Sequence, residues 1–188
     1  GQVHVCYARP EAESPETLAL AHEHLDAEER RRAAAFYFES DRTTYVVAHA
    51  LVRGLLSRYT GVEPRAWRFE VGPHGRPEVA HTPGTPPLRF NLSHTRGLVV
   101  CALVLARDLG VDVEALDRPA PLEVADRWFA RPELADLRAL PEPDQPERFF
   151  TLWTLKEAYI KARGLGLALP LDSFTFHLEP DGAIRIGF

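Results

Sequence analysis

The sequence of 188 residues contains no methionine and only two cysteines. Cys6 and Cys101 lack the spacing of metal ligands, and a single pair of thiols does not make a disulfide framework. None of the eight histidines belongs to a His-x-x-x-His pair. The common zinc motifs and a disulfide-stapled fold are therefore excluded.

Long apolar runs and an excess of positive charge are also missing. No apolar stretch approaches the roughly 20 residues of a membrane span, and no signal-peptide pattern opens the chain. The 22 Lys and Arg residues against 27 Asp and Glu give a net charge of −5, which argues against non-specific binding to nucleic acid. We expect a cytoplasmic protein with no nucleic-acid partner and no membrane partner.

One acidic segment is informative. In Gly110-Val111-Asp112-Val113-Glu114, valines alternate with carboxylates, which predicts a strand. On a strand Asp112 and Glu114 leave the same face about 7 Å apart, at about 3.3 Å rise per residue. Carboxylate oxygens at this spacing suit one hard divalent cation such as Mg²⁺.

A second segment, residues 153–162 (WTLKEAYIKA), predicts a helix. Trp153, Glu157 and Lys161 recur every four residues and share one face, so Glu157 can meet the acidic pair while Lys161 lies one turn away. Lys156 points about 100° away around the helix. We include it among the candidates because its long side chain could turn back toward a ligand.

Each segment alone also has an ordinary structural explanation. Asp112 and Glu114 fit the solvated face of an edge strand, and Glu157 with Lys161 fits a stabilising pair on a helix surface. A third segment, residues 90–95 (FNLSHT), favours function. It leads into the apolar run 98–105, which turns directly into the acidic segment. We therefore expect Ser93 and His94 on the same hairpin as the acidic pair.

The segments FNLSHT, GVDVE and WTLKEAYIKA, in this order and at these spacings, resemble the signature motifs of Sfp-type 4′-phosphopantetheinyl transferases. The resemblance runs from about Leu25 to Phe188. It implies transfer of the 4′-phosphopantetheine arm of coenzyme A to a serine of an acyl or peptidyl carrier protein, with release of 3′,5′-ADP. The Ala-, Arg- and Pro-rich composition suggests a GC-rich genome, and hence polyketide or nonribosomal peptide pathways.

The resemblance also implies roles for the charged residues. Asp112, Glu114 and Glu157 would hold Mg²⁺ against the pyrophosphate. Glu157 would accept the serine proton, directly or through water, and Lys161 would steady the pyrophosphate or the leaving group as a cation or an acid. Which of Glu157 and Lys161 performs the proton transfer stays open.

Coenzyme A would be bound by residues from both sides of the acidic segment. His94 matches a family position that touches the 3′-phosphate, and Arg76 matches a basic position near the adenine end. Arg32 and Arg42 match basic positions less closely, and a solvated arginine face is the alternative for their region. The full expected set is Arg32, Arg42, Arg76, Ser93, His94, Lys156 and Lys161.

A weak internal repeat indicates the fold. Five positions, Phe69, Val71, Pro73, Gly75 and Val79, have counterparts 107 positions later at Phe176, Leu178, Pro180, Gly182 and Ile186. Each copy predicts a strand, a turn and a second strand. The helix candidates 45–59 and 149–163 align near an offset of 104, which sets Arg53 against Glu157.

We therefore predict an α+β fold of two similar halves with pseudo-twofold symmetry, about 1–104 and 105–188, each with a small antiparallel sheet packed with helices. The first half would contact the nucleotide of coenzyme A and the second would carry the metal and catalytic residues. A counterpart of the 90–104 strand would begin near residue 197, so we expect the second sheet to lack an edge. One site within one chain makes a monomer the simplest expectation.

Two other hypotheses use the same residues. A Mg²⁺-dependent hydrolase of a nucleotide or coenzyme A pyrophosphate would need no protein acceptor, but the sequence lacks the glutamate-dense helix expected of one. A non-catalytic module that binds coenzyme A or a carrier would be free to lose its acidic residues and Lys161, yet all of them are present.

Overall fold

The computed structural model describes residues 1–72, 74–81 and 83–188. The helices are α1 (Pro15–His24), α2 (Ala27–Ala34), α3 (Glu39–Thr60), α4 (Ala125–Trp128), α5 (Arg131–Ala139) and α6 (Gln145–Arg163). The strands are β1 (Val3–Ala8), β2 (Phe69–Val71), β3 (Pro77–Val79), β4 (Leu88–Thr95), β5 (Leu98–Leu105), β6 (Thr175–Leu178) and β7 (Ile184–Gly187). The predicted α+β class is confirmed.

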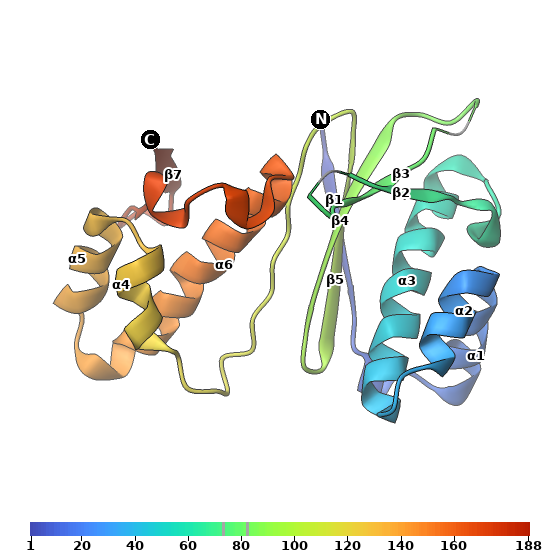
Figure 1. The fold of residues 1–188 in the computed structure, drawn as a ribbon, viewed down its shortest axis with the longest axis horizontal. Coiled ribbons are helices and arrows are strands. Elements are labelled where there is room, and N and C mark those ends of the chain that lie inside the picture. The colour runs from blue at the N-terminus through green and yellow to red at the C-terminus, as the bar shows by residue number, and fades with distance from the viewer. Residues whose placement is uncertain (73, 82) are drawn as a thin grey trace.

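The strands form three small antiparallel sheets. One has three strands in the order β1-β5-β4, and β2-β3 and β6-β7 are two-stranded hairpins. Figure 1 shows the three-stranded sheet in the middle, with α1, α2 and α3 on one side and α4, α5 and α6 on the other. Residues 106–121 run between this sheet and α6. Both hairpins of the predicted repeat are present, although Pro73 lies outside the described residues.

The two faces of the central sheet pack against different halves of the molecule. On one face Phe90 and Leu103 join Leu56 of α3 in an apolar cluster. On the other face Ala102 and Val104 pack against Leu109 and Val111. Because side chains alternate along a strand, this period of two turns Ser93 of β4 away from α3 and toward residues 109–112.

The acidic segment is not a strand, contrary to the prediction. Residues 106–121 contain no helix or strand. The Val111 N–H donates to the side-chain Oδ1 of Asn91 over 2.8 Å, where a strand would donate to a backbone carbonyl. The alternating valines and carboxylates therefore belong to an irregular segment, and the Asn91 side chain binds its backbone at Val111.

A buried cation on the long helix of each half defines the internal repeat. Arg53 of α3 donates through Nε to Glu29, over 2.7 Å, and also binds the carbonyl oxygens of Pro64 and Trp67. Lys156 of α6 contacts Glu133 over 2.8 Å and donates to the carbonyl oxygens of Leu171 and Phe174. The side chains of Arg53 and Lys156 are 1% and 0% exposed.

This repeat corrects the predicted alignment of the two helices. α3 and α6 each end at a left-handed glycine, Gly61 and Gly164, and these glycines differ by 103 positions, as do Arg53 and Lys156. The counterpart of Arg53 is therefore Lys156, and Glu157 corresponds to Gly54. The earlier offset of 104 matched apolar residues that recur along any amphipathic helix.

No helix in the part of the chain that the structure describes is both long and apolar enough to cross a membrane.

Glu29 should make the stability of the protein depend on pH. Burial raises its pKa, but hydrogen bonds from His49, Arg53 and the Asp26 N–H outweigh burial and lower the pKa from 4.5 to about 2. The ionised form is therefore favoured by folding, and about 3 kcal/mol of stability should be lost as the pH falls from about 5 to 2.

Urea unfolding at pH 5 and pH 3 would test this expectation. Glu29→Gln should be less stable at pH 5 and lose less stability on acidification than the wild type. The same change at the exposed Glu142 is the control and should leave the steep dependence intact. Equal losses in wild type and Glu29→Gln would contradict the assignment.

Candidate functional site

The three sequence motifs meet where α6 faces β4. Lys161 Nζ donates to Asp112 Oδ1 over 2.6 Å and to Ser93 Oγ over 3.0 Å. Ser93 Oγ in turn donates to Asp112 Oδ1 over 2.8 Å. The Asp112 side chain is 7% exposed and that of Lys161 is 29% exposed. The site thus combines residues 68 positions apart in a partly buried ionic cluster.

Gly110 and Asn91 position the acidic segment against α6. A Cβ atom at Gly110 would overlap the carbonyl oxygen of Ala158 and lie 2.6 Å from the backbone nitrogen of Ala162. Only glycine permits this approach. On the other side, buried Asn91 accepts the Val111 N–H. Sequence reasoning missed both roles, although both residues lie inside the motifs GVDVE and FNLSHT.

Glu157 lies half-buried beside this cluster. Burial and the negative charges of Asp112 and Glu114 raise its pKa, and Lys161 partly counteracts them. Glu157 and Lys161 line a pocket of about 360 Å³, to which Arg76 and Leu92 also contribute. The pocket lies between the β2-β3 hairpin, β4 and the C-terminal part of α6, so both halves of the chain form its walls.

Glu114 is paired with a cation that sequence reasoning did not identify. Arg118 donates to Glu114 Oε2 over 2.7 Å, and its guanidinium lies 4.9 Å from the ring centroid of Phe150. The Glu114 side chain is 20% exposed. The spacing of four residues between glutamate and arginine was the available signal, but no helix is present here to make such a spacing meaningful.

The carboxylates fit a hard divalent cation in kind. Asp112 Oδ2 is buried and has no hydrogen-bond partner among the described residues. Burial first, and then the nearby carboxylates of Asp112 and Glu114, raise the pKa of Glu157. Within residues 1–72, 74–81 and 83–188, however, no three His, Cys, Asp or Glu side chains stand close enough to hold a metal ion. The positive charges beside Asp112 and Glu114 are instead those of Lys161 and Arg118.

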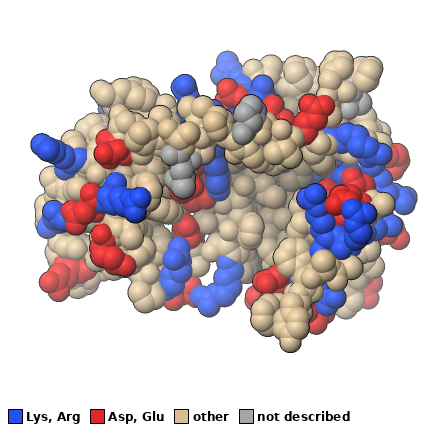
Figure 2. All heavy atoms as spheres, in the orientation of Figure 1, with Lys and Arg blue, Asp and Glu red and all other residues tan. Residues whose placement is uncertain are grey.

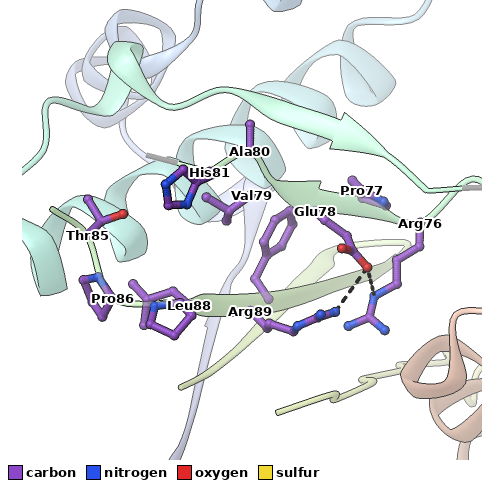
Figure 3. A pocket seen from close by; sticks show the side chains of 12 residues that line it. Arg76, Pro77, Glu78, Val79, Ala80, His81, Thr85, Pro86, Leu88 and Arg89 are labelled. Carbon is purple, nitrogen blue, oxygen red and sulfur yellow. Dashed lines mark hydrogen bonds and ion pairs between the residues drawn. The ribbon is translucent and has the colours of Figure 1, made fainter. Parts of the chain in front are cut away.

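Arg76 links the two halves beside the pocket. Its guanidinium donates to the carbonyl oxygen of Ala162 over 2.9 Å and contacts Asp108 at 3.6 Å, and its side chain is only 9% exposed. Figure 3 shows Arg76 and Arg89 converging on Glu78 at the edge of a second pocket of about 320 Å³. Arg76 is thus a partly buried residue that joins the two halves, and not the exposed turn residue that its sequence neighbours suggest.

The structure separates His94 from Ser93. Because adjacent strand residues face opposite ways, His94 lines a different groove, of about 690 Å³, together with Thr44 and His49 of α3. Arg32 is exposed and donates to Glu28 over 3.0 Å, and Arg42 is exposed in the first turn of α3. Among the described residues that line this groove, neither arginine appears.

Lys156 requires a correction. It was expected to turn toward a ligand, but its ammonium is bound inside the C-terminal half by Glu133 and two carbonyl oxygens. Burial lowers its pKa. A fully buried cation with three close oxygen partners is not available to a ligand in the pocket.

The surface carries charges of both signs close together. Figure 2 shows basic and acidic side chains interspersed over this face of the molecule, without a broad field of one sign. An anionic ligand would therefore be held by particular side chains and not by a general positive potential.

Comparison with known proteins identifies the family. Residues 108–188 match the family model described as the 4′-phosphopantetheinyl transferase superfamily, and residues 12–105 match the N-terminal domain of 4′-phosphopantetheinyl transferases. The chain belongs to the 4′-phosphopantetheinyl transferase superfamily. The resemblance to Sfp-type enzymes is thereby confirmed, as is the expected enzyme class.

Two curated members illustrate the extent of the similarity. The 4′-phosphopantetheinyl transferase Sfp of Bacillus subtilis is 35% identical over 162 residues, which cover 86% of this chain and 70% of Sfp. The 4′-phosphopantetheinyl transferase HetI of a Nostoc species is 37% identical over 157 residues, which cover 83% of this chain and 66% of HetI.

Gly110→Ala should destabilise this 4′-phosphopantetheinyl transferase, because the new methyl group would push the acidic segment away from α6. We expect a loss of about 1–3 kcal/mol in the free energy of unfolding, as for other overpacked sites. Denaturant unfolding monitored by circular dichroism would measure it.

Gly54→Ala is the matched control for this substitution. A Cβ at this helical position meets only the His24 ring at 3.6 Å, which is ordinary contact. It should leave stability unchanged or raise it by up to about 1 kcal/mol, as expected for glycine replaced inside a helix. If Gly110→Ala were as stable as Gly54→Ala, the close approach would be wrong.

Proposed function

We propose that this enzyme transfers the 4′-phosphopantetheine arm of coenzyme A to a serine of an acyl or peptidyl carrier protein, with Mg²⁺ as the required metal. The observation that carries the proposal is the contact of Ser93, Asp112 and Lys161. It lies beside the pocket that Lys161 and Glu157 line together with residues of the first half. The relatives named as 4′-phosphopantetheinyl transferases support the reaction type.

The acidic residues would form the metal site. Asp112, Glu114 and Glu157 supply the hard oxygen donors, and the buried Asp112 Oδ2 without a partner is the first candidate ligand. When bound, Mg²⁺ would neutralise charge on the pyrophosphate oxygens of coenzyme A. The protein's part is to hold Asp112 and Glu114, in the segment 106–121, beside Glu157 of α6.

In the proposed reaction the carrier serine Oγ forms a bond to the β-phosphorus of coenzyme A, and the bond from that phosphorus to the bridging oxygen breaks. The serine proton goes to Glu157, directly or through a water molecule. 3′,5′-ADP leaves with the electron pair of the broken bond.

The cations would position the phosphates and stabilise the charge on the departing oxygen. Lys161 lies on the wall of the pocket and can reach a phosphate there by rotating its flexible side chain. Arg76 lines the same pocket. His94, Arg32 and Arg42 would act farther away, at the 3′-phosphate. Lys156 has no part in this proposal because it is bound inside the core.

The carrier protein, in polyketide or nonribosomal peptide biosynthesis, would present its serine at the pocket between the halves. The proposed halves, 1–104 and 105–188, divide the work between nucleotide contacts and metal and proton transfer. All proposed residues come from one chain, so we propose a monomer, working in the cytoplasm.

Intact-mass spectrometry of an apo carrier protein incubated with the enzyme, coenzyme A and Mg²⁺ would test the transfer. We expect the mass gain of one phosphopantetheine group, lost on addition of EDTA. Glu157→Gln should slow the transfer by about 10²- to 10⁴-fold, the usual contribution of a general base.

Glu147→Gln, on the first turn of the same helix, is the control and should transfer at the wild-type rate. If no carrier gained mass while 3′,5′-ADP was still released, the enzyme would be a hydrolase. If coenzyme A bound without any product, it would be a binding module.

A further inference from the structure

Two of the three proposed metal-binding carboxylates, Asp112 and Glu114, form ion pairs with basic side chains of the protein. Lys161 Nζ lies 2.6 Å from Asp112 Oδ1, and Arg118 lies 2.7 Å from Glu114 Oε2. The ion pair at Asp112 is partly buried, and the Ser93 hydroxyl also donates to the same carboxylate oxygen. Without a ligand, the charge that would attract a metal ion is therefore largely compensated.

A divalent cation and these two side chains compete for the same negative charge. A cation bound by Asp112 would stand close to the Lys161 ammonium, and like charges at a few ångströms repel strongly in a partly buried site. Asp112 has one oxygen without a partner, so the site is prepared for a further positive ligand only if Lys161 withdraws.

A polyphosphate bound in the pocket offers Lys161 a new anionic partner, and the exposure of Arg118 lets it move into solvent. Lys161 and Arg76 line the same pocket. A phosphate bound there could replace Asp112 as the anionic partner of the Lys161 ammonium, so that the ammonium would remain paired. The Arg118 side chain is 46% exposed and rests on the face of Phe150, so it can leave Glu114 without unpacking a core.

We propose that Lys161 and Arg118 are internal counter-ions that keep the metal site closed until a polyphosphate ligand draws Lys161 away and Arg118 moves into solvent, so that divalent cation and coenzyme A bind cooperatively. This inference rests on the proposed function. It adds Arg118 as a positioning residue, and it gives Lys161 a role in the ligand-free enzyme. Linkage makes the coupling reciprocal: each ligand tightens the binding of the other by the same factor.

The test measures metal binding to the ligand-free full chain. Mn²⁺, followed by the electron paramagnetic resonance signal of the free ion, is the probe. Lys161→Met should bind Mn²⁺ about tenfold more tightly than the wild type, within the usual range of coupling. Arg118→Met should show a smaller gain, because its ion pair is more exposed and therefore weaker.

Two controls assign the gain to this site. Arg185→Met removes the arginine of an exposed pair with Glu179 on the β6-β7 hairpin and should leave Mn²⁺ affinity unchanged. Adding Asp112→Asn to Lys161→Met should abolish the gain. Urea unfolding of each variant checks the fold. If Lys161→Met does not fold, the half-exposed Arg118→Met carries the test.

The outcomes separate this inference from the proposed function. If neither folded variant binds Mn²⁺ more tightly than the wild type, while the wild type still modifies a carrier protein, the counter-ion model is wrong and the transferase stands. If no variant binds Mn²⁺ and no carrier is modified, both are wrong. Tighter binding by the folded variants, absent in the Asp112→Asn combination, supports the model.

Discussion

The buried cation on each long helix is the interaction on which the rest of the structure depends. Arg53 and Lys156 each bind a glutamate whose side chain caps the preceding helix, Glu29 and Glu133. Each also binds two backbone carbonyl oxygens from the segment after its own helix. Removing Arg53, Lys156 or Glu133 would leave a buried charge without its partner, which is among the most destabilising changes a protein can undergo. Arg53 has a second acidic partner, Asp26, at 2.8 Å. In each half, the side chain of one buried cation therefore joins three consecutive parts of the chain: the preceding helix, the long helix and the segment after it.

The orientation of the proposed catalytic residues follows from this anchor. With Lys156 held in the C-terminal core, the next residue around the helix is turned by about 100°, and this rotation directs Glu157 toward the acidic segment. The N-terminal half has the same anchor in Arg53, but Gly54 stands where Glu157 stands in the other half and faces only the His24 ring. One half thus keeps the scaffold without the chemistry, which accounts for a single site from a repeated fold.

Sequence patterns predicted the elements that depend on local periodicity. They failed where a side chain from a distant part of the sequence binds the backbone or a charged group. The long helices α3 and α6, the two Pro-x-Gly hairpins and the apolar β5 follow from periods of 3.6 and 2 and from turn residues. The prediction of a strand at 110–114 was wrong. The Asn91 side chain accepts the hydrogen bond from the Val111 N–H, which in a sheet a carbonyl oxygen of a neighbouring strand would accept. The prediction that Lys156 turns toward a ligand was wrong because its partner Glu133 lies in another helix, and nothing in the sequence of α6 indicates that partner. The glycines that end α3 and α6 would have given the correct register, since left-handed caps fix a helix end more sharply than apolar matches do.

The junction between the halves is held by few apolar contacts and several polar ones. Leu109 and Val111 pack on the central sheet, while Arg76, Ser93 and Asn91 reach across the junction through hydrogen bonds and ion pairs. Interfaces of this mixed kind permit relative motion more readily than large apolar ones. A ligand that contacts Arg76 from one half and Lys161 from the other would add its binding free energy to the junction itself. Because the acidic segment lies inside that junction, anything that closes it also fixes the distance between Asp112 and Glu157. Under the proposed function, ligand binding and assembly of the metal site would be parts of one equilibrium, coupled through the ionic cluster at Lys161.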